Sequence, residues 1–174
     1  MVFRAPNTRE LISGFADYVL QRELGNTYYS DPDMPSREHP ADILPQEMDK
    51  LRNMMLDLIN QPAHFQQWLG EFISQSRHEL DIAPPEPPYQ PDEIYDVLKH
   101  GGVLVRLGGL RVLRIGDEVY VNGERVDSPH RPALAALADH IVLSAENIGD
   151  ALEDPSFLAM LASLINSGYW FFEG

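Results

Sequence analysis

The chain has 174 residues, 44% of them hydrophobic, with no cysteine and a formal charge of −14 from 13 Lys and Arg against 27 Asp and Glu. This composition can form the core of one ordinary domain or two small ones, and it excludes disulfides, thiol nucleophiles and cysteine-based metal sites. The excess of acid opposes binding to a phosphate backbone and favours a basic protein as partner, although an acidic surface can also serve solubility alone. We expect a cytoplasmic protein without membrane contact, because no stretch is long and apolar enough to span a bilayer and the first residues lack signal or transit character.

The first part of the chain predicts three amphipathic helices. One begins at Asn7 or Thr8, one runs from Pro45 to Ile59 after a long loop at 25–44, and one starts at Pro62. Each repeats apolar side chains three and four residues apart, so each has one apolar face to bury. Without a neighbouring sheet, these faces must pack against each other or against a second subunit. The predicted dimer or packing face consists of Leu11, Phe15, Val19, Met48, Leu51, Met55, Leu58, Phe65, Trp68 and Phe72.

Five prolines between Ala83 and Pro91 mark the clearest boundary along the chain. Proline fixes φ and lacks a backbone donor, so residues 82–91 are expected to form a semi-rigid linker rather than a helix or a central strand.

After the linker, a short helix from Pro91 precedes four short β-rich runs separated by glycine-containing turns. We expect one antiparallel meander from residues 103–107, 110–115, 118–121 and 124–126. Three helices are predicted next, at Pro132–Ile141, Ser144–Leu152 and Pro155–Asn166, followed by an aromatic strand at 169–172 that docks on the meander. The predicted fold class is therefore α+β, a helical region followed by a winged-helix-type domain with a small antiparallel sheet.

The sequence supplies residue types for a metal site but not the spacing. Six histidines are present, yet none is followed two residues later by Asp or Glu, as in the usual paired motif of a facial-triad iron site. Phosphate loops and nucleophile elbows are absent as well. Arg106, Arg111, Arg114 and Arg125 could form a basic stripe, but acidic residues in the same strands favour cross-strand ion pairs. We therefore predict no catalytic, cofactor-binding or metal-binding residue in this chain.

Three stretches resemble a known family: residues 3–11 (FRAPNTREL), 74–90 (SQSRHELDIAPPEPPYQ) and 154–174 (DPSFLAMLASLINSGYWFFEG). They are similar to the bacterial ribosomal oxygenases, which are JmjC, cupin-type enzymes. Members of that family use iron(II), 2-oxoglutarate and dioxygen to hydroxylate an arginine of a basic large-subunit ribosomal protein.

In that family a JmjC barrel is followed by a helical dimerisation region and a winged-helix domain. The resemblance therefore implies that residues 1–6 leave the barrel, 7–81 form the dimerisation region, 82–91 the linker and 92–174 the winged-helix-like domain. The iron ligands and the 2-oxoglutarate site would lie before Met1. The implied function is that of a non-catalytic carboxyl-terminal fragment that forms a homodimer and contacts the substrate protein, but binds neither nucleic acid nor membrane.

Two other functions remain open from the sequence. A free-standing winged-helix regulator that binds DNA would need a basic recognition helix, but the helices predicted at 144–152 and 155–166 contain no Lys or Arg. An enzyme with an unrecognised site built from histidines and carboxylates would retain stoichiometric metal through mild chelation.

Overall fold

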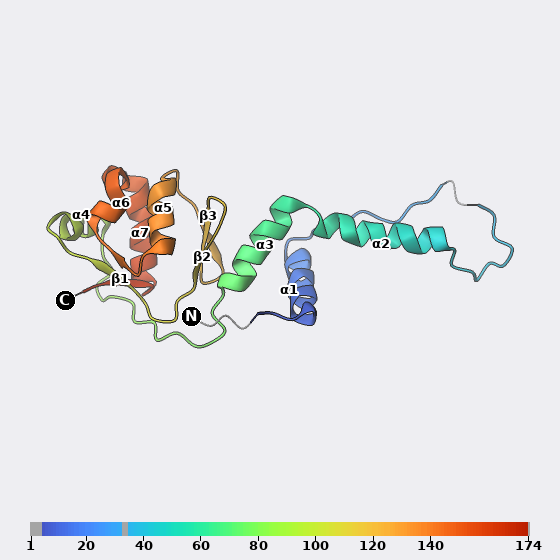
Figure 1. The fold of residues 1–174 in the computed structure, drawn as a ribbon, viewed down its shortest axis with the longest axis horizontal. Helices are drawn as coiled ribbons and strands as arrows, with labels where there is room; N and C mark the ends of the chain where they lie inside the picture. The colour runs from blue at the N-terminus through green and yellow to red at the C-terminus, as the bar shows by residue number, and fades with distance from the viewer. Residues whose placement is uncertain (1–4, 33–34, 174) are drawn as a thin grey trace. The chain divides into compact units, whose positions relative to one another are not determined.

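The computed structural model describes residues 5–32 and 35–173, and Figure 1 shows their helices and strands. The chain divides between Trp68 and Leu69 into two units, here called unit 1 and unit 2. Residues 1–4, most of the predicted exit from the barrel, lie outside the described residues. No helix within the described ranges is long and apolar enough to cross a membrane.

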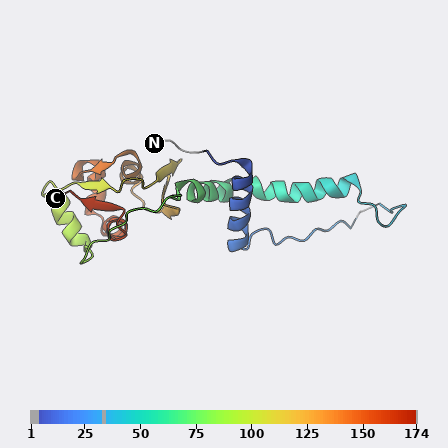
Figure 2. The same cartoon turned by 90° about the horizontal axis from the view of Figure 1, so that it is seen from below.

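Unit 1 contains the helices that the apolar periodicity predicts. They are α1 (Thr8–Gln21), α2 (Pro45–Ile59) and the part of α3 (Pro62–Ser74) that precedes Leu69. Asn7 and Glu10 start α1 as a capping box, because the side chain of each accepts a hydrogen bond of 3.0 Å from the backbone N–H of the other. The prolines that open α2 and α3 stand where a helix needs no backbone donor. In both views α1 runs across the corner between α2 and α3 (Figures 1 and 2).

The long loop between α1 and α2 is held to the start of α2 by polar contacts. Lys50 donates a hydrogen bond of 2.5 Å to the carbonyl of Ser30. Arg37 pairs with the carboxylate of Glu47, and that carboxylate also accepts a hydrogen bond from the backbone N–H of Leu44 at 2.8 Å. These contacts use the charged side chains of α2, while its Met48, Leu51, Met55 and Leu56 side chains are exposed.

Unit 2 contains two of the three hairpin turns that the sequence predicts. β2 (Val112–Ile115), β3 (Glu118–Val121) and β4 (Glu124–Val126) form an antiparallel meander. The turn between β3 and β4 has positive φ angles at both Asn122 and Gly123, of 48° and 94°. Asparagine and glycine accept these angles readily, which is why the Asn-Gly pair predicts this turn.

The first predicted strand does not belong to that meander. β1 (Leu104–Arg106) forms a second sheet, between β5 (Val142–Leu143) and β6 (Trp170–Phe172), and both pairings are antiparallel. The prediction of one four-stranded meander is therefore wrong, because both edges of β1 are occupied by strands from the end of the chain and none is left for β2. The terminal aromatic strand pairs with β1 and not with β2–β4.

Two helices of unit 2 differ from the prediction, one because it is divided and one because it is shorter. The helices of unit 2 are α4 (Pro91–Lys99), α5 (Arg131–Asp139), α6 (Ala145–Ile148), the 3-10 helix η1 (Gly149–Glu153) and α7 (Pro155–Asn166). The predicted single helix at 144–152 is two short ones, because Gly149 adopts a positive φ of 62° that interrupts it. The predicted extension of α5 to Ile141 is also wrong, since the chain turns there to enter β5.

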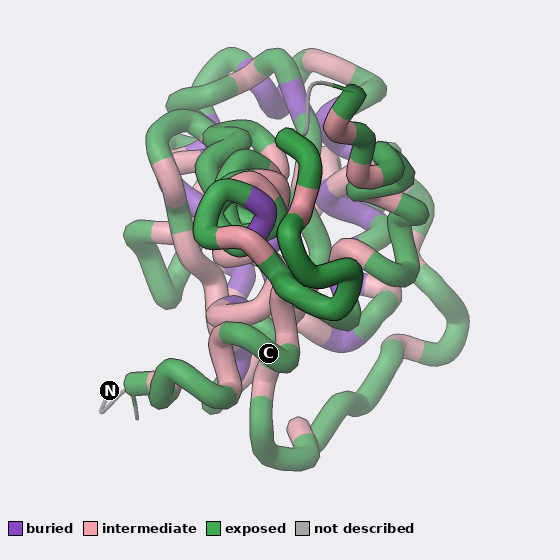
Figure 3. Tube along the Cα trace, turned by 90° about the vertical axis from the view of Figure 1, so that its right-hand side faces the viewer, coloured by how far each residue is buried: buried purple, intermediate pink, exposed green. Residues whose placement is uncertain are grey.

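The helices and sheets of unit 2 enclose one apolar core. Figure 3 colours buried, intermediate and exposed residues along the chain. The largest fully buried side chains come from α4, both sheets, α5 and α7, and they include Ile94, Leu98, Tyr120, Leu134, Phe157, Leu161 and Trp170. Burying a side chain of the size of leucine or phenylalanine stabilises a fold by about 1.5–3 kcal/mol, so this core is the main source of stability in unit 2.

Residues 82–91, the predicted linker, lie within unit 2. The side chain of Asn166 on α7 accepts a hydrogen bond from the Tyr89 N–H and donates one to the Tyr89 carbonyl, each at 2.9 Å. The end of the proline-rich segment is thus fastened to α7. The limits assigned to the dimerisation region and the winged-helix domain stay a prediction.

The last turn of α3 is held by the hairpin between β3 and β4. The buried hydroxyl of Ser74 accepts a hydrogen bond from the Gly123 N–H at 2.9 Å. The Asn122 amide accepts one from the Ser76 N–H at 3.1 Å and donates one to the Tyr169 hydroxyl at 3.1 Å. The first two of these bonds fasten the end of α3 to the turn between β3 and β4.

Gly70 permits the close approach of α3 to the sheet, and its replacement by alanine should destabilise unit 2. A Cβ atom at Gly70 would lie 2.4 Å from the ring of Tyr120, which is 0% exposed. We expect Gly70→Ala to lower the free energy of unfolding by roughly 1–3 kcal/mol, although alanine favours an isolated helix by about 1 kcal/mol. Urea denaturation measures this change. Gly108→Ala is the matched control, because a Cβ atom there meets nothing within 4 Å. Equal stability of the two variants would contradict the prediction.

Candidate binding surface

An apolar groove of about 350 Å³ lies within unit 1. Helix α1 contributes one face, in which Leu11, Phe15 and Val19 recur at four-residue spacing. The carboxyl-terminal end of α2 and the first turns of α3 supply the remaining walls, with Met55, Leu58, Ile59, Phe65 and Trp68. No charged side chain lines the groove, so it suits an apolar ligand or protein surface.

Aromatic packing fixes the floor of this groove. The ring of Phe15 on α1 meets the Trp68 indole edge to face at a centroid distance of 5.1 Å, and Phe65 lies 5.3 Å from the same indole. Phe15 also stacks on Tyr18 at 6.2 Å. Such contacts add roughly 0.5–1.5 kcal/mol each beyond the area that they bury. They join α1 to α3, while Met55 and Ile59 of α2, which also line the groove, remain exposed.

The structure brings together seven of the ten residues that the sequence assigned to a dimer or packing face. They are Leu11, Phe15, Val19, Met55, Leu58, Phe65 and Trp68. Met48 and Leu51 lie nearer the start of α2 and are exposed, and Leu51 lines a neighbouring hollow of about 530 Å³ together with Met54, Met55 and Leu58. Phe72 belongs to unit 2. A role for these residues in a dimer stays a prediction.

Three groove residues were not on the predicted face. Ile12 and Ile59 belong to the same three- and four-residue repeats, so the spacing could have included them. Ala16 could not be assigned to the apolar face from the sequence, because alanine occurs on both the buried and the exposed faces of helices.

A polar hollow of about 430 Å³ lies in unit 2, next to the first turns of α5 and α7. At its side His130 Nε2 lies 2.6 Å from Asp154 Oδ2, and the ring of His130 packs against Phe157 at a centroid distance of 6.0 Å. Asp154 Oδ1 accepts hydrogen bonds from the backbone N–H and the hydroxyl of Ser156, at 2.7 Å and 2.8 Å. The hydrogen bonds from His130 and Ser156 lower the pKa of Asp154 to about 2.

These three residues resemble a catalytic triad in type but not in arrangement. A nucleophilic serine needs its hydroxyl hydrogen-bonded to the histidine, with the carboxylate behind the histidine. Here the Ser156 hydroxyl bonds to Asp154 instead. Asp154 is the cap of α7, and His130 immediately precedes α5, so the contact fastens the starts of two helices together.

The histidines do not assemble a metal site in the part of the chain that the structure describes. No group of three or more His, Cys, Asp or Glu side chains is placed to hold a metal ion there. A facial-triad iron centre needs three such ligands with open positions beside them. The described residues therefore do not fit the iron that the resemblance implies for the complete enzyme.

The four arginines for which a basic stripe was the alternative to cross-strand ion pairs have different partners. Arg125 pairs with Glu118 at 3.1 Å, which is the expected cross-strand contact, and Arg114 lies 3.5 Å from Asp139 on α5. Arg106 donates to the carbonyls of Leu137 and Ala138 at the end of α5, and Arg111 donates to those of Ile73 and Gln75 at the end of α3. The expectation of a cross-strand ion pair is thus confirmed for Arg125, whereas Arg114 pairs with a helix and Arg106 donates to carbonyls that a helix end leaves unpaired.

Comparison with known proteins connects the chain to the ribosomal oxygenases. The family model of the ROXA-like winged helix matches residues 57–171. The ribosomal protein uL16 3-hydroxylase of Escherichia coli (strain K12) is 85% identical over 172 residues, which are 99% of this chain and 46% of that protein. The solved structure of the E. coli ribosomal oxygenase YcfD with cobalt and 2-oxoglutarate matches with a TM-score of 0.95 and 85% identity, over 99% of this chain and 48% of that chain.

A second structure of that oxygenase, with cobalt and succinic acid, matches with a TM-score of 0.96 and 85% identity over 99% of this chain and 48% of that one. The chain thus spans about half the length of the relatives that it matches. These matches confirm the resemblance to the carboxyl-terminal portion of the ribosomal oxygenases, and they confirm the α+β, winged-helix fold.

The contact between His130 and Asp154 predicts a loss of stability in acid. The pKa of Asp154 in the folded chain, about 2, lies below its ordinary value of 3.8, so this carboxylate stabilises the fold above about pH 4 and ceases to do so as the pH falls towards 2. We expect Asp154→Asn to be less stable than the unmodified chain at pH 6, and the difference to shrink steadily as the pH falls from about 4 to 2. Urea denaturation at several pH values measures it. A deficit in Asp154→Asn that stays constant across this pH range would refute the prediction.

Proposed function

Because this chain belongs to the ROXA-like winged-helix family, we propose that it is the non-catalytic carboxyl-terminal part of a ribosomal-protein arginine hydroxylase that uses iron(II) and 2-oxoglutarate. Its role is to form a homodimer through unit 1 and to contact the substrate protein. The 85% identity to a hydroxylase of ribosomal protein uL16 supports the type of enzyme, and the 2-oxoglutarate bound in the related oxygenase structure supports the cosubstrate.

The proposed homodimer is supported by the exposed apolar side chains of unit 1. Ile12, Leu20 and Met55 are 66%, 75% and 70% exposed, whereas Tyr18 and Trp68 are the apolar side chains that the described part of unit 1 buries. A contiguous apolar surface of this kind marks an interaction site. It lies around a groove lined entirely by uncharged residues, so the partner must offer an apolar surface too.

A second copy of the chain is the partner that meets this requirement most directly. Two identical apolar surfaces related by a twofold axis cover each other, and such isologous interfaces are the commonest in homodimers. Leu11, Phe15 and Leu58 would then lie at the centre of the interface, where apolar side chains contribute most to affinity. The rest of the longer enzyme is the other candidate to cover this groove, and it predicts a monomeric chain in isolation.

Contact with a basic substrate follows from the charge of unit 2. Residues 69–174 carry 17 Asp and Glu against 7 Lys and Arg, so this unit attracts a basic ribosomal protein and repels a nucleic acid. Helix α7 has no Lys or Arg with which to neutralise phosphates. We therefore propose a protein partner, in the cytoplasm, and no nucleic acid or membrane.

The catalytic chemistry is assigned to the portion of the enzyme that this chain does not span. That portion would be the JmjC, cupin-type barrel with the iron ligands and the 2-oxoglutarate site, and residues 1–6 would lead out of it. Residues 7–81 would be the dimerisation region, 82–91 the linker and 92–174 the winged-helix domain. No step of the oxygenase reaction is assigned to residues of this chain.

The dimer predicts a solution mass of about twice the 19.7 kDa of the chain, persisting on dilution. Ile12→Lys places a charge in the groove from an exposed position, so it should give a mass near that of the monomer while circular dichroism still shows the helices. Burying this unpaired charge should raise the dissociation constant by about 100-fold or more. Light scattering across a dilution series measures both masses.

Asn53→Lys is the control for this experiment, because it adds the same charge at an exposed position of α2 that does not line the groove. It should keep the mass of the unmodified chain. A monomeric unmodified chain at every concentration would refute the dimer.

A further inference from the structure

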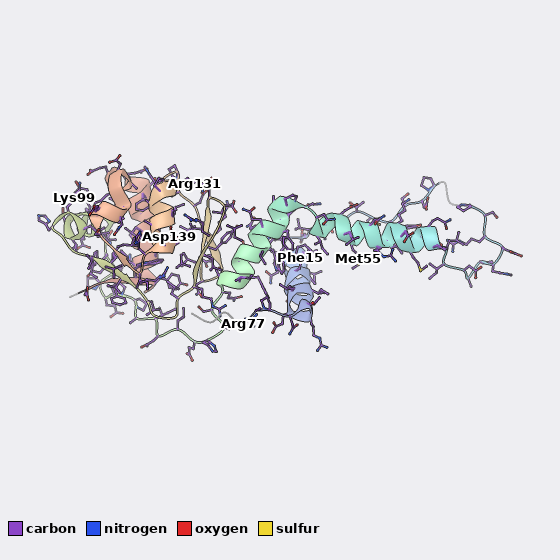
Figure 4. All side chains as sticks on the ribbon, viewed as in Figure 1. Phe15, Met55, Arg77, Lys99, Arg131 and Asp139 are labelled. Atoms are coloured by element: carbon purple, nitrogen blue, oxygen red, sulfur yellow. The ribbon has the colours of Figure 1, made fainter. Side chains whose placement is uncertain are left out.

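Most of the described methionines lie on α2, whose carboxyl-terminal end lines the apolar groove of unit 1. The structure describes four methionine side chains, and three of them, Met48, Met54 and Met55, lie on this helix. Met55, labelled in Figure 4, is 70% exposed and lines both the groove and the neighbouring hollow. The fourth, Met160 on α7, is partly buried against the core of unit 2. Oxidants therefore have access to the thioether of Met55, which lines the groove, as well as to that of Met48, which does not.

We propose that Met55 is an oxidation site through which hydroperoxides weaken the self-association of this chain. The sulfur lone pair attacks the outer oxygen of the hydroperoxide, the S–O bond forms as the O–O bond breaks, and the leaving oxygen takes up the remaining proton. Met55 becomes methionine sulfoxide, and the peroxide is reduced to water or an alcohol. This inference rests on the proposed homodimer, because it concerns the regulation of the same surface.

The sulfoxide is a poor fit to the groove. Oxidation replaces a flexible apolar thioether with a strongly polar S=O group that requires a hydrogen-bond donor when it is buried. The groove neighbours Leu58, Ile59 and Phe15 offer hydrocarbon and aromatic groups instead of donors. Covering the sulfoxide with a second copy thus leaves a buried polar oxygen unsatisfied, and in a twofold dimer this cost arises twice.

The dimer itself controls the access of the oxidant. Met55 is exposed in a single chain, but a partner seated on the groove would cover it. Oxidation should therefore act on the dissociated chain and then oppose reassociation. The rate of sulfoxide formation at Met55 should rise as the protein is diluted, whereas the slow rate at Met160 should not depend on concentration.

The experiment uses the 174-residue chain, hydrogen peroxide as oxidant, peptide mass spectrometry to locate the sulfoxide, and light scattering to measure the dissociation constant before and after treatment. The quantity compared is the ratio of the two constants, because Met55→Leu can change the starting value. We expect a ratio of about 10 or more for the unmodified chain and for Met160→Leu, and a clearly smaller ratio for Met55→Leu.

Each outcome supports or overturns a definite statement. A chain that is monomeric before treatment overturns the proposed dimer and this inference with it. A dimer whose dissociation constant is unchanged after complete oxidation of Met55 overturns the inference alone. An equal ratio in Met55→Leu and the unmodified chain assigns the sensitivity to another methionine, and it overturns the role of Met55 in the same way.

Discussion

Unit 1 has more apolar surface than its own helices can bury, and this constraint shapes the part of the molecule available for assembly. Three amphipathic helices in a bundle normally need a fourth helix or a second copy to close the apolar side. Here α1 and α3 meet through the rings of Phe15 and Trp68, but Met55 and Ile59 of α2 remain exposed beside them. The start of the loop between α1 and α2 shares the neighbouring hollow with Met54 and Leu58, and its hydrogen bonds to α2 use Lys50 and Glu47. The groove thus remains because unit 1 has only three helices among its described residues and no fourth element to cover their apolar side chains.

Unit 2, in contrast, buries its large apolar side chains in its own core. Its two sheets and its helices bury Trp170, Phe157 and Tyr120 completely, so its fold needs no partner to complete a core. The hairpin turn at Asn122 and Gly123 also satisfies polar groups at the end of α3. A unit with a complete core and an acidic surface is suited to present charge, whereas a unit with an open groove is suited to associate. The division of tasks proposed for the chain follows from this difference.

Much of this architecture could be predicted from the sequence, because its signals are local. The cap at Asn7, the prolines at Pro45 and Pro62, and the apolar spacing that follows them each act within a few residues, and all three helices form as expected. The Asn-Gly turn is equally local. Seven groove residues were predicted for the same reason, since helical periodicity states which side chains share a face.

The sheet of β1 could not be predicted in this way. Gly108 and Gly109 form a turn that looks like a hairpin, yet β1 pairs with β5 and β6, whose positions depend on the packing of α5 and α7. β5 has two residues, too few to show any period. The pairing of distant strands depends on which side chains become buried, here Leu104 and Trp170. A local sequence pattern does not show which strand will pair with β1.

The arginines explain how a domain with a winged-helix fold can lack a basic surface. Arg106 is partly buried, and burial lowers its pKa, while its guanidinium donates to carbonyls at the end of α5. Arg111 serves the end of α3 in the same manner. Helix carboxyl termini carry partial negative charge, so these cations stabilise the fold from within the domain. Arginines engaged in this way contribute little to a continuous basic face, and the acidic side chains around them determine the kind of partner that unit 2 attracts.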